Sequence, residues 1–321
     1  MLRLPAFRYL QPTALAEALR MKAGAGPDGM FVAGGTDLYP NMKRRHQEPK
    51  IVISLMAIPE LRERSDNRIG ACVTLSDLTA DPPFGPSALR TAAALVSTPL
   101  LRNMGTIGGN LCLDTRCNYY NQSYEWRKSI DFCMKKDGAI CWVAPSSPRC
   151  WAVSSSDVAP VMVAIGAEYR LMGTQGERIV PAGRFYNNDG INYLTKQPDE
   201  ILVDVRLPVP NGWDAVYHKL RRRGSFDFPV LGVAAWIRWN GRTVGDARVV
   251  LGGVASYPQE IPAAGATLKG SSLSDEAIAA AADAAYQPSK PMDNTDFDLS
   301  WRKQMTRVYV KRALEELRAR H

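Results

Sequence analysis

Met-Gly-Thr-Ile-Gly-Gly-Asn, residues 104–110, is the stretch around which the sequence is organised. Its glycines permit a tight turn whose backbone can come very close to another group, because no Cβ prevents the approach. A loop follows that carries four cysteines at a C-x15-C-x7-C-x8-C spacing: Cys117, Cys133, Cys141 and Cys150. A glycine turn that runs into a cysteine-bearing loop indicates two redox groups side by side, held by the rest of the chain.

The bulk composition narrows the class of protein. With 321 residues, 45% of them hydrophobic, the chain can bury a large core, and its length is typical of two or three domains. The formal net charge is +8. The basic clusters at residues 43–45 and 221–223 are short and contain no aromatic residue, so we expect no nucleic-acid binding. The same charges suit a solvated surface, the phosphates of a dinucleotide or an acidic protein partner.

The sequence also predicts where the protein resides. Residues 1–12 have neither the apolar core nor the cleavage site of a signal peptide, and no run of about 18 apolar residues could span a membrane. We therefore expect a cytoplasmic protein without membrane insertion. Six cysteines in a cytosolic chain rarely form structural disulfides, so they are predicted to be buried apolar residues or metal ligands.

A second glycine turn, Ala-Gly-Gly-Thr-Asp-Leu at residues 33–38, follows a helix predicted over residues 12–23 and a strand over 30–32. Thr13 is the expected N-cap of that helix. The adjacent glycines allow successive N–H groups to face one anion, Thr36 adds a hydroxyl donor, and a helix over residues 37–43 would add positive potential. The turn is a candidate phosphate cradle, although from the residues alone an ordinary glycine hairpin is the commoner explanation.

The remaining pattern predicts an α+β fold with a domain boundary in the Pro- and Gly-bearing stretch at residues 208–212. Ahead of the boundary the sequence predicts strands at 51–55, 68–75, 168–172, 177–180 and 201–207, and helices at 87–96 and 156–165. Beyond it come antiparallel strands at 215–220, 230–239 and 247–252, then helices at 274–285 and 301–320.

Together these motifs resemble the FAD-binding subunits of the molybdenum hydroxylases, a family that includes carbon monoxide dehydrogenase and xanthine dehydrogenase. Residues 33–38 with Met42 and Lys43 are similar to the family's first flavin motif, and Thr106–Asn110 are similar to the second. Further short matches occur in family order along nearly the whole chain: Pro59–Leu61, Ile69–Ala71, Pro198–Leu202, Lys219 with Arg222, and Gly252–Ala255. Each motif alone is weak, and their common order makes the resemblance specific.

The resemblance implies a fold in two parts. Residues 1–211 would form a two-subdomain FAD-binding domain of the PCMH (vanillyl-alcohol oxidase-like) type, with subdomains of about 1–55 and 56–211. Residues 212–321 would form an α+β domain similar to the C-terminal domain of the carbon monoxide dehydrogenase flavoprotein. The cysteine-bearing insert would span about residues 115–151 of the first domain.

The insert departs from the common family pattern and resembles the β subunit of 4-hydroxybenzoyl-CoA reductase. The likeness covers Asp114–Cys117, Tyr120–Ser123 and the cysteine order. In that subunit the loop carries a [4Fe-4S] cluster, so the resemblance implies Cys117, Cys133, Cys141 and Cys150 as cluster ligands. From the cysteines alone, zinc, a cluster and unrelated thiols are equally good interpretations, because the loop contains no C-x-x-C pair. We interpret Cys112 as a packing residue.

A FAD site also follows from the resemblance. The first motif would hold the pyrophosphate, the second would line the opposite wall, and Asn118 would link the cysteine loop to the cofactor. Asp157 would accept a hydrogen bond, and Lys219 would meet flavin or phosphate oxygens, although a surface lysine is a nearly equal interpretation. The predicted cofactor-binding residues are Val32, Ala33, Gly34, Gly35, Thr36, Asp37, Leu38, Thr106, Ile107, Gly108, Gly109, Asn110, Asn118, Asp157 and Lys219.

The function implied by the resemblance is electron transfer by a subunit that contains FAD and [4Fe-4S], most similar to 4-hydroxybenzoyl-CoA reductase, with ferredoxin as the external carrier. Its partners would be a small [2Fe-2S] subunit and a large molybdopterin subunit in a hetero-hexamer. No catalytic residue is predicted, because the three histidines show no ligand or triad spacing. Two alternatives stay open: a conventional FAD subunit that passes electrons to NAD or quinone, and a non-enzymatic basic binding module.

Overall fold

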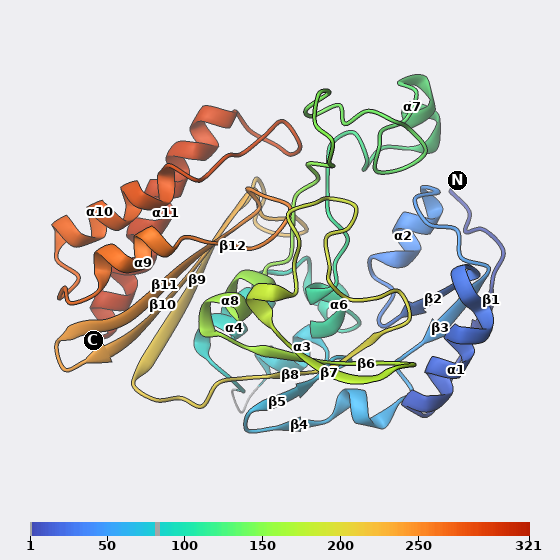
Figure 1. The fold of residues 1–321 in the computed structure, drawn as a ribbon, viewed down its shortest axis with the longest axis horizontal. Helices are drawn as coiled ribbons and strands as arrows, with labels where there is room; N and C mark the ends of the chain where they lie inside the picture. The colour runs from blue at the N-terminus through green and yellow to red at the C-terminus, as the bar shows by residue number, and fades with distance from the viewer. Residues whose placement is uncertain (1, 81–83) are drawn as a thin grey trace.

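The computed structural model describes residues 2–80 and 84–321, and its strands form three sheets (Figure 1). The first sheet is parallel, in the order β1-β3-β2, with β1 (Arg8–Leu10), β2 (Gly29–Val32) and β3 (Ile51–Ser54). Helix α1 (Leu15–Ala25) packs on β2 and β3 through its buried Leu15 and Ala18. The short helix α2 (Leu38–Lys43) begins just after β2, so the first glycine turn lies between them.

The second sheet is antiparallel, in the order β4-β5-β8-β6-β7. Its strands are β4 (Arg64–Ser65), β5 (Arg68–Gly70), β6 (Glu168–Gly173), β7 (Gly176–Pro181) and β8 (Ile201–Arg206). The helices of this region are α3 (Leu75–Thr79), α4 (Ser87–Leu95), α5 (Pro99–Arg102), α6 (Ile107–Leu111) and α8 (Val158–Ile165). Helix α8 is buried along its whole length, because nearly all its side chains are apolar and the largest core cluster surrounds it.

The third sheet is also antiparallel, in the order β12-β11-β10-β9, and separates two helical layers. Its strands are β9 (Trp213–Leu220), β10 (Leu231–Asn240), β11 (Thr243–Gly252) and β12 (Gln259–Glu260), and helices α9 (Pro262–Leu268), α10 (Asp275–Tyr286) and α11 (Leu299–Arg320) follow. Along β10, Ala234 and Trp236 join the core that contains α4 and α8, whereas Val233 and Ala235 join the core beneath α9–α11. The period-two alternation of the strand thus directs apolar residues to both faces.

The insert leaves the body of the fold between α6 and α8. Figure 1 shows it as a long looped segment that rises above the sheets and carries the helix α7 (Tyr124–Ser129). A bridge between Arg116 and Val153 closes its base, with backbone hydrogen bonds of 2.9 and 2.7 Å. Among the helices described, none combines the length and apolar character needed to cross a membrane.

Most predicted elements are confirmed within a few residues, and two details differ. The strand expected over residues 68–75 ends at Gly70, because Thr74 and Asp77 form a reciprocal capping box that starts α3. The predicted N-cap at Thr13 is wrong, since Ala14 occupies that position. The backbone N–H of Thr13 donates to the Glu17 carboxylate instead, at 2.9 Å.

Candidate functional site

The two glycine turns singled out in the sequence lie against each other in the structure. A Cβ on Gly34 would collide with the carbonyl group of Met104, so this approach requires glycine. On the other turn, a Cβ on Gly105 would lie 3.5 Å from the hydroxyl oxygen of Thr36. The fold therefore combines the two predicted flavin motifs into one candidate site.

The first turn offers a row of backbone donors. Within residues 2–80 and 84–321, the N–H groups of residues 34–38 donate no hydrogen bond to another residue, and neither does the Thr36 hydroxyl. Gly35 has a φ of 70°, a conformation that glycine adopts without strain and that lets successive N–H groups line one concave surface. Such a surface binds anions, so these residues fit a phosphate group. Helix α2 adds little potential, because it has only six residues.

The other residues of the first motif support the turn. Val32 is buried at the end of β2, and its carbonyl accepts a hydrogen bond from the N–H of Leu55 at 2.8 Å. Ala33 and Leu38 pack against the small cores on either side of the first sheet. The Asp37 carboxylate accepts hydrogen bonds from Asn41, at 3.0 Å, and from Arg116 of the cysteine loop. Asp37 is thus already paired within the protein.

The second motif is mainly scaffold. Thr106 caps α6 by accepting a hydrogen bond from Gly109 at 3.0 Å, and Ile107 and Gly108 are buried. The side-chain amide oxygen of Asn110 accepts hydrogen bonds from the Ser156 hydroxyl, at 2.7 Å, and from a backbone N–H at the start of α8. Only Gly109 of the five predicted residues is exposed. A ligand at this wall would therefore meet backbone around Gly109, while the neighbouring side chains hold that backbone in place.

Asp157 and Lys219 pair with each other, so neither of these two side chains is available to contact a ligand. The Lys219 ammonium lies 2.8 Å from the Asp157 carboxylate, and the two side chains are 0% and 3% exposed. Tyr217 donates to the same carboxylate at 2.8 Å, and Lys219 also donates to the Leu95 carbonyl. Burial raises the pKa of Asp157 and lowers that of Lys219, while their mutual attraction opposes both shifts. The surface-lysine interpretation is wrong, and the pair joins β9 to the start of α8.

The four loop cysteines line one small cavity. Cys117, Cys133, Cys141 and Cys150 are 4–6% exposed. The rest of the lining consists of Tyr119, Tyr120, Met134, Lys135, Trp142, Val143 and Ala152. Burial raises the pKa of Cys117 to about 11, whereas a hydrogen bond from Cys150 lowers the pKa of Cys141. Asn118 is exposed, and its N–H donates to the Asn294 carbonyl at 3.0 Å, so its observed link is to the C-terminal region. The predicted cysteine set is brought together as a group.

The cavity does not have the arrangement of a single-ion site. Among the described residues, no three or more His, Cys, Asp or Glu side chains converge closely enough to hold one metal ion. A zinc ion would need its sulfur ligands about 2.3 Å from a common point. A [4Fe-4S] cluster is larger and binds one cysteine at each of four irons, so its ligands surround a wider space. Four cysteines are the donor set that such a cluster uses, so the cluster stays a prediction.

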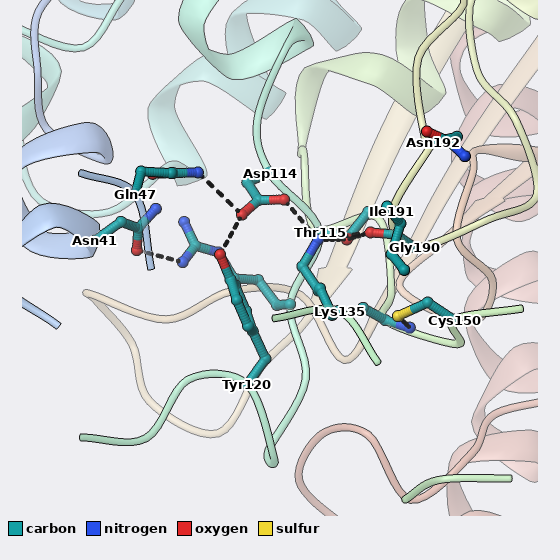
Figure 2. A network of polar contacts seen from close by, with 12 residues as sticks. Asn41, Gln47, Asp114, Thr115, Tyr120, Lys135, Cys150, Gly190, Ile191 and Asn192 are labelled. Carbon is teal, nitrogen blue, oxygen red and sulfur yellow. Dashed lines mark hydrogen bonds and ion pairs between the residues drawn. The ribbon is translucent and has the colours of Figure 1, made fainter. Parts of the chain in front are cut away.

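Figure 2 shows a buried polar network beside this cavity. The Lys135 side chain, 6% exposed, lies near Cys150 and donates to Asp114 and Thr115 at 2.8 Å each. Asp114 also accepts from the Tyr120 hydroxyl at 3.0 Å. Sequence reasoning missed Lys135. Its only local signal was a lysine between two cysteines, because its partners are distant in the chain.

Comparison with known families identifies the chain. Residues 5–210 match the family described as the FAD binding domain in molybdopterin dehydrogenase, and residues 215–317 match the CO dehydrogenase flavoprotein C-terminal domain. The chain belongs to the FAD-binding medium subunits of the molybdenum hydroxylases. The predicted fold class is therefore confirmed.

Several relatives of this medium subunit extend over most of its length. The carbon monoxide dehydrogenase medium chain of Hydrogenophaga pseudoflava is 30% identical and covers 98% of both chains. The aldehyde oxidoreductase FAD-binding subunit PaoB of Escherichia coli is 33% identical over 82% of this chain and 86% of its own. The solved carbon monoxide dehydrogenase from Hydrogenophaga pseudoflava superposes with a TM-score of 0.79 over 98% of this chain and 97% of the other.

The comparisons support FAD binding and membership of the broader family, and they do not extend to the resemblance to 4-hydroxybenzoyl-CoA reductase. None of the relatives named here is described as a coenzyme A reductase or as carrying an iron–sulfur cluster. The likeness to 4-hydroxybenzoyl-CoA reductase therefore stays a prediction. The individual cofactor contacts and the exact domain limits are also predictions.

Proposed function

We propose that this medium subunit passes electrons outward from a molybdenum-bearing partner, through bound FAD, to an acceptor such as NAD or a quinone. Related chains described as subunits of carbon monoxide dehydrogenase, aldehyde oxidoreductase and nicotine 6-hydroxylase support this conventional role over the reductase-like one. Because the chain belongs to a family of oxidoreductase subunits, the alternative of a non-enzymatic basic binding module has no support.

The observation that carries the proposal is the row of N–H groups at residues 34–38, which have no partner among the described residues and lie beside the second glycine turn. These groups and the Thr36 hydroxyl would hold the pyrophosphate, and the exposed backbone at Gly109 would form the facing wall. When bound, FAD supplies a carrier for two electrons. The protein binds and orients it, and no general acid or base of this chain is required.

The proposed complex contains three kinds of subunit. Relatives named as medium chains imply a smaller and a larger companion, which we infer to be a [2Fe-2S] subunit and a molybdopterin subunit. The assembly would be a hetero-hexamer of two such trios. Co-expression with the partners, followed by a mass measurement of the purified complex, tests this composition; a chain that purifies free of both partners contradicts it.

A second candidate function adds a [4Fe-4S] cluster, supported by the four cysteines that line one buried cavity. The cluster would give the subunit a port for a one-electron carrier such as ferredoxin, as in a 4-hydroxybenzoyl-CoA reductase-like enzyme. Cys117, Cys133, Cys141 and Cys150 would be its ligands, with Lys135 as a neighbouring buried cation.

Cofactor analysis of the anaerobically purified chain tests both candidates. We expect one FAD per chain with an absorbance that reductant bleaches, and a chain that retains no FAD would contradict the main proposal. About four irons per chain with an equal amount of sulfide favour the cluster, and fewer than about three irons per chain contradict it. In the full complex, reoxidation of the flavin by NAD or quinone supports outward flow, whereas reduction by ferredoxin alone favours the reductase-like alternative.

A further inference from the structure

The short helix that follows the phosphate cradle is held at both ends by arginines of the cysteine segment. At its start, the Arg116 guanidinium donates to the Asp37 carboxylate and, at 3.2 Å, to the Asn41 side chain. At its end, Arg127 of α7 donates to the carbonyl of Arg44 at 2.9 Å. Both contacts join residues more than 70 positions apart. The cysteine segment therefore clamps α2.

These arginines are deeply buried. The Arg116 side chain is 6% exposed, and Arg127 is wholly inaccessible. Beside them, the His46 ring stacks on Tyr120 of the cysteine loop at a centroid distance of 4.1 Å. Burial is the main cause that lowers the pKa of His46 to about 4, so the ring packs as a neutral group. A helix of six residues has little stability of its own, so its position depends on such contacts.

Arg116 also lies at the point where the two candidate sites meet. It immediately precedes Cys117, and its backbone closes the base of the insert against Val153. Its side chain reaches Asp37, the last residue before α2 and a member of the row of free N–H groups. One residue thus connects the cysteine cavity to the cradle. Loss of its side chain would leave Asp37 without its charged partner and free the cradle to move.

Resting on the proposed function, we propose that Arg116 is a positioning residue for FAD and that the folded cysteine loop forms a structural half of the flavin cradle. Arg116 itself need not touch FAD, because it fixes Asp37 and thereby residues 34–38. FAD affinity then depends on whether the cysteine loop is folded.

The test is a fluorescence titration of the FAD-depleted full chain with FAD, which does not require turnover. We expect Arg116→Gln to weaken binding at least tenfold and Arg116→Lys, which keeps the charge but cannot bond both Asp37 and Asn41 equally well, to weaken it less. Arg149→Gln is the matched control. Arg149 lies on the same loop and donates to Asn188 and not to a residue of the cradle, so FAD affinity should stay within about twofold of the wild type.

A double-mutant cycle separates positioning from general loss of structure. If Arg116 acts through Asp37, adding Asp37→Asn to Arg116→Gln should cause little further loss of FAD affinity. If the two residues act independently, the fold-losses in FAD affinity of the two single variants should multiply. Cys133→Ser should also weaken FAD binding several-fold through disorder of the loop. If Arg116→Gln does not fold, Arg116→Lys with Asp37→Asn provides the cycle.

The outcomes distinguish this inference from the proposed function. A wild-type chain that binds no FAD would contradict the proposed function itself. The wild-type chain can bind FAD while an Arg116 variant binds it equally well, or while the double-mutant cycle is additive. Either result would overturn the coupling between the cysteine loop and the cradle and would leave the proposed function standing.

Discussion

At the scale of single residues, the close contact between the two glycine turns determines which positions must be glycine. Glycine at positions 34 and 35 was expected because phosphate must approach the backbone. The structure adds closer causes: Gly34 abuts the Met104 carbonyl, and Gly35 has a positive φ with the Tyr39 ring beside it. The contact of Gly34 with Met104 and the positive φ of Gly35 are not visible in the local motif, because both arise only in the folded chain.

The first prediction follows from this contact. Gly34→Ala should force the two turns apart, reduce FAD affinity by more than tenfold and destabilise the chain by about 1–3 kcal/mol, the usual cost of overpacking. Equilibrium unfolding and FAD titration measure the two effects. The matched control is Gly24→Ala, since Gly24 lies in α1 with nothing near the added Cβ. Wild-type FAD affinity in Gly34→Ala would contradict the close contact of the turns.

At the scale of elements, the regular segments were predictable and the insert was not. Apolar residues at successive positions marked β10 and β11 as strands, and in the structure each of these strands has a core on both faces. The three-residue strand β1 was missed, since its exposed pattern carries no period and its partner β3 lies far along the chain. The cysteine loop has one short helix, so its shape comes from long-range polar contacts that spacing does not encode.

One of those contacts yields the second prediction. Asn294, in the loop before α11, accepts a hydrogen bond from the Asn118 N–H and donates to the Trp151 carbonyl at 2.6 Å. It therefore joins the residues that follow the first and last loop cysteines. If the loop holds a cluster, Asn294→Ala should speed the loss of iron to a chelator several-fold.

The control for this measurement is Asn192→Ala, because Asn192 is exposed and lies apart from Cys150 in Figure 2. Equal rates of iron loss from Asn294→Ala and the wild type would show that the C-terminal loop does not stabilise the cluster. A wild-type chain without iron would instead contradict the cluster proposal.

At the scale of the whole molecule, the two family domains share one core. Apolar residues of the third sheet, including Tyr217 and Trp236, pack with α4 and α8 of the FAD-binding domain. The Pro- and Gly-bearing composition of residues 208–212 predicts a boundary there, which stays a prediction. The extent of the shared interface was not predictable, because it depends on which face of β9 and β10 each apolar residue occupies. Near its edge, the Asp157–Lys219 pair joins the two domains through buried charges.

This pair carries the third prediction. Lys219→Met would leave the Asp157 carboxylate buried without its cation, so we expect a loss of about 3–5 kcal/mol in the free energy of unfolding. Adding Asp157→Asn removes the orphaned charge and should recover part of that loss, whereas two independent sites would destabilise additively.

Lys311→Met, which breaks an exposed pair with Glu315 on α11, is the control and should change stability little. Chemical denaturation of these three variants and of the wild type measures these differences. A Lys219→Met chain as stable as the control would mean that the carboxylate has found another partner or taken up a proton, and that the charge pair does not hold the domains together.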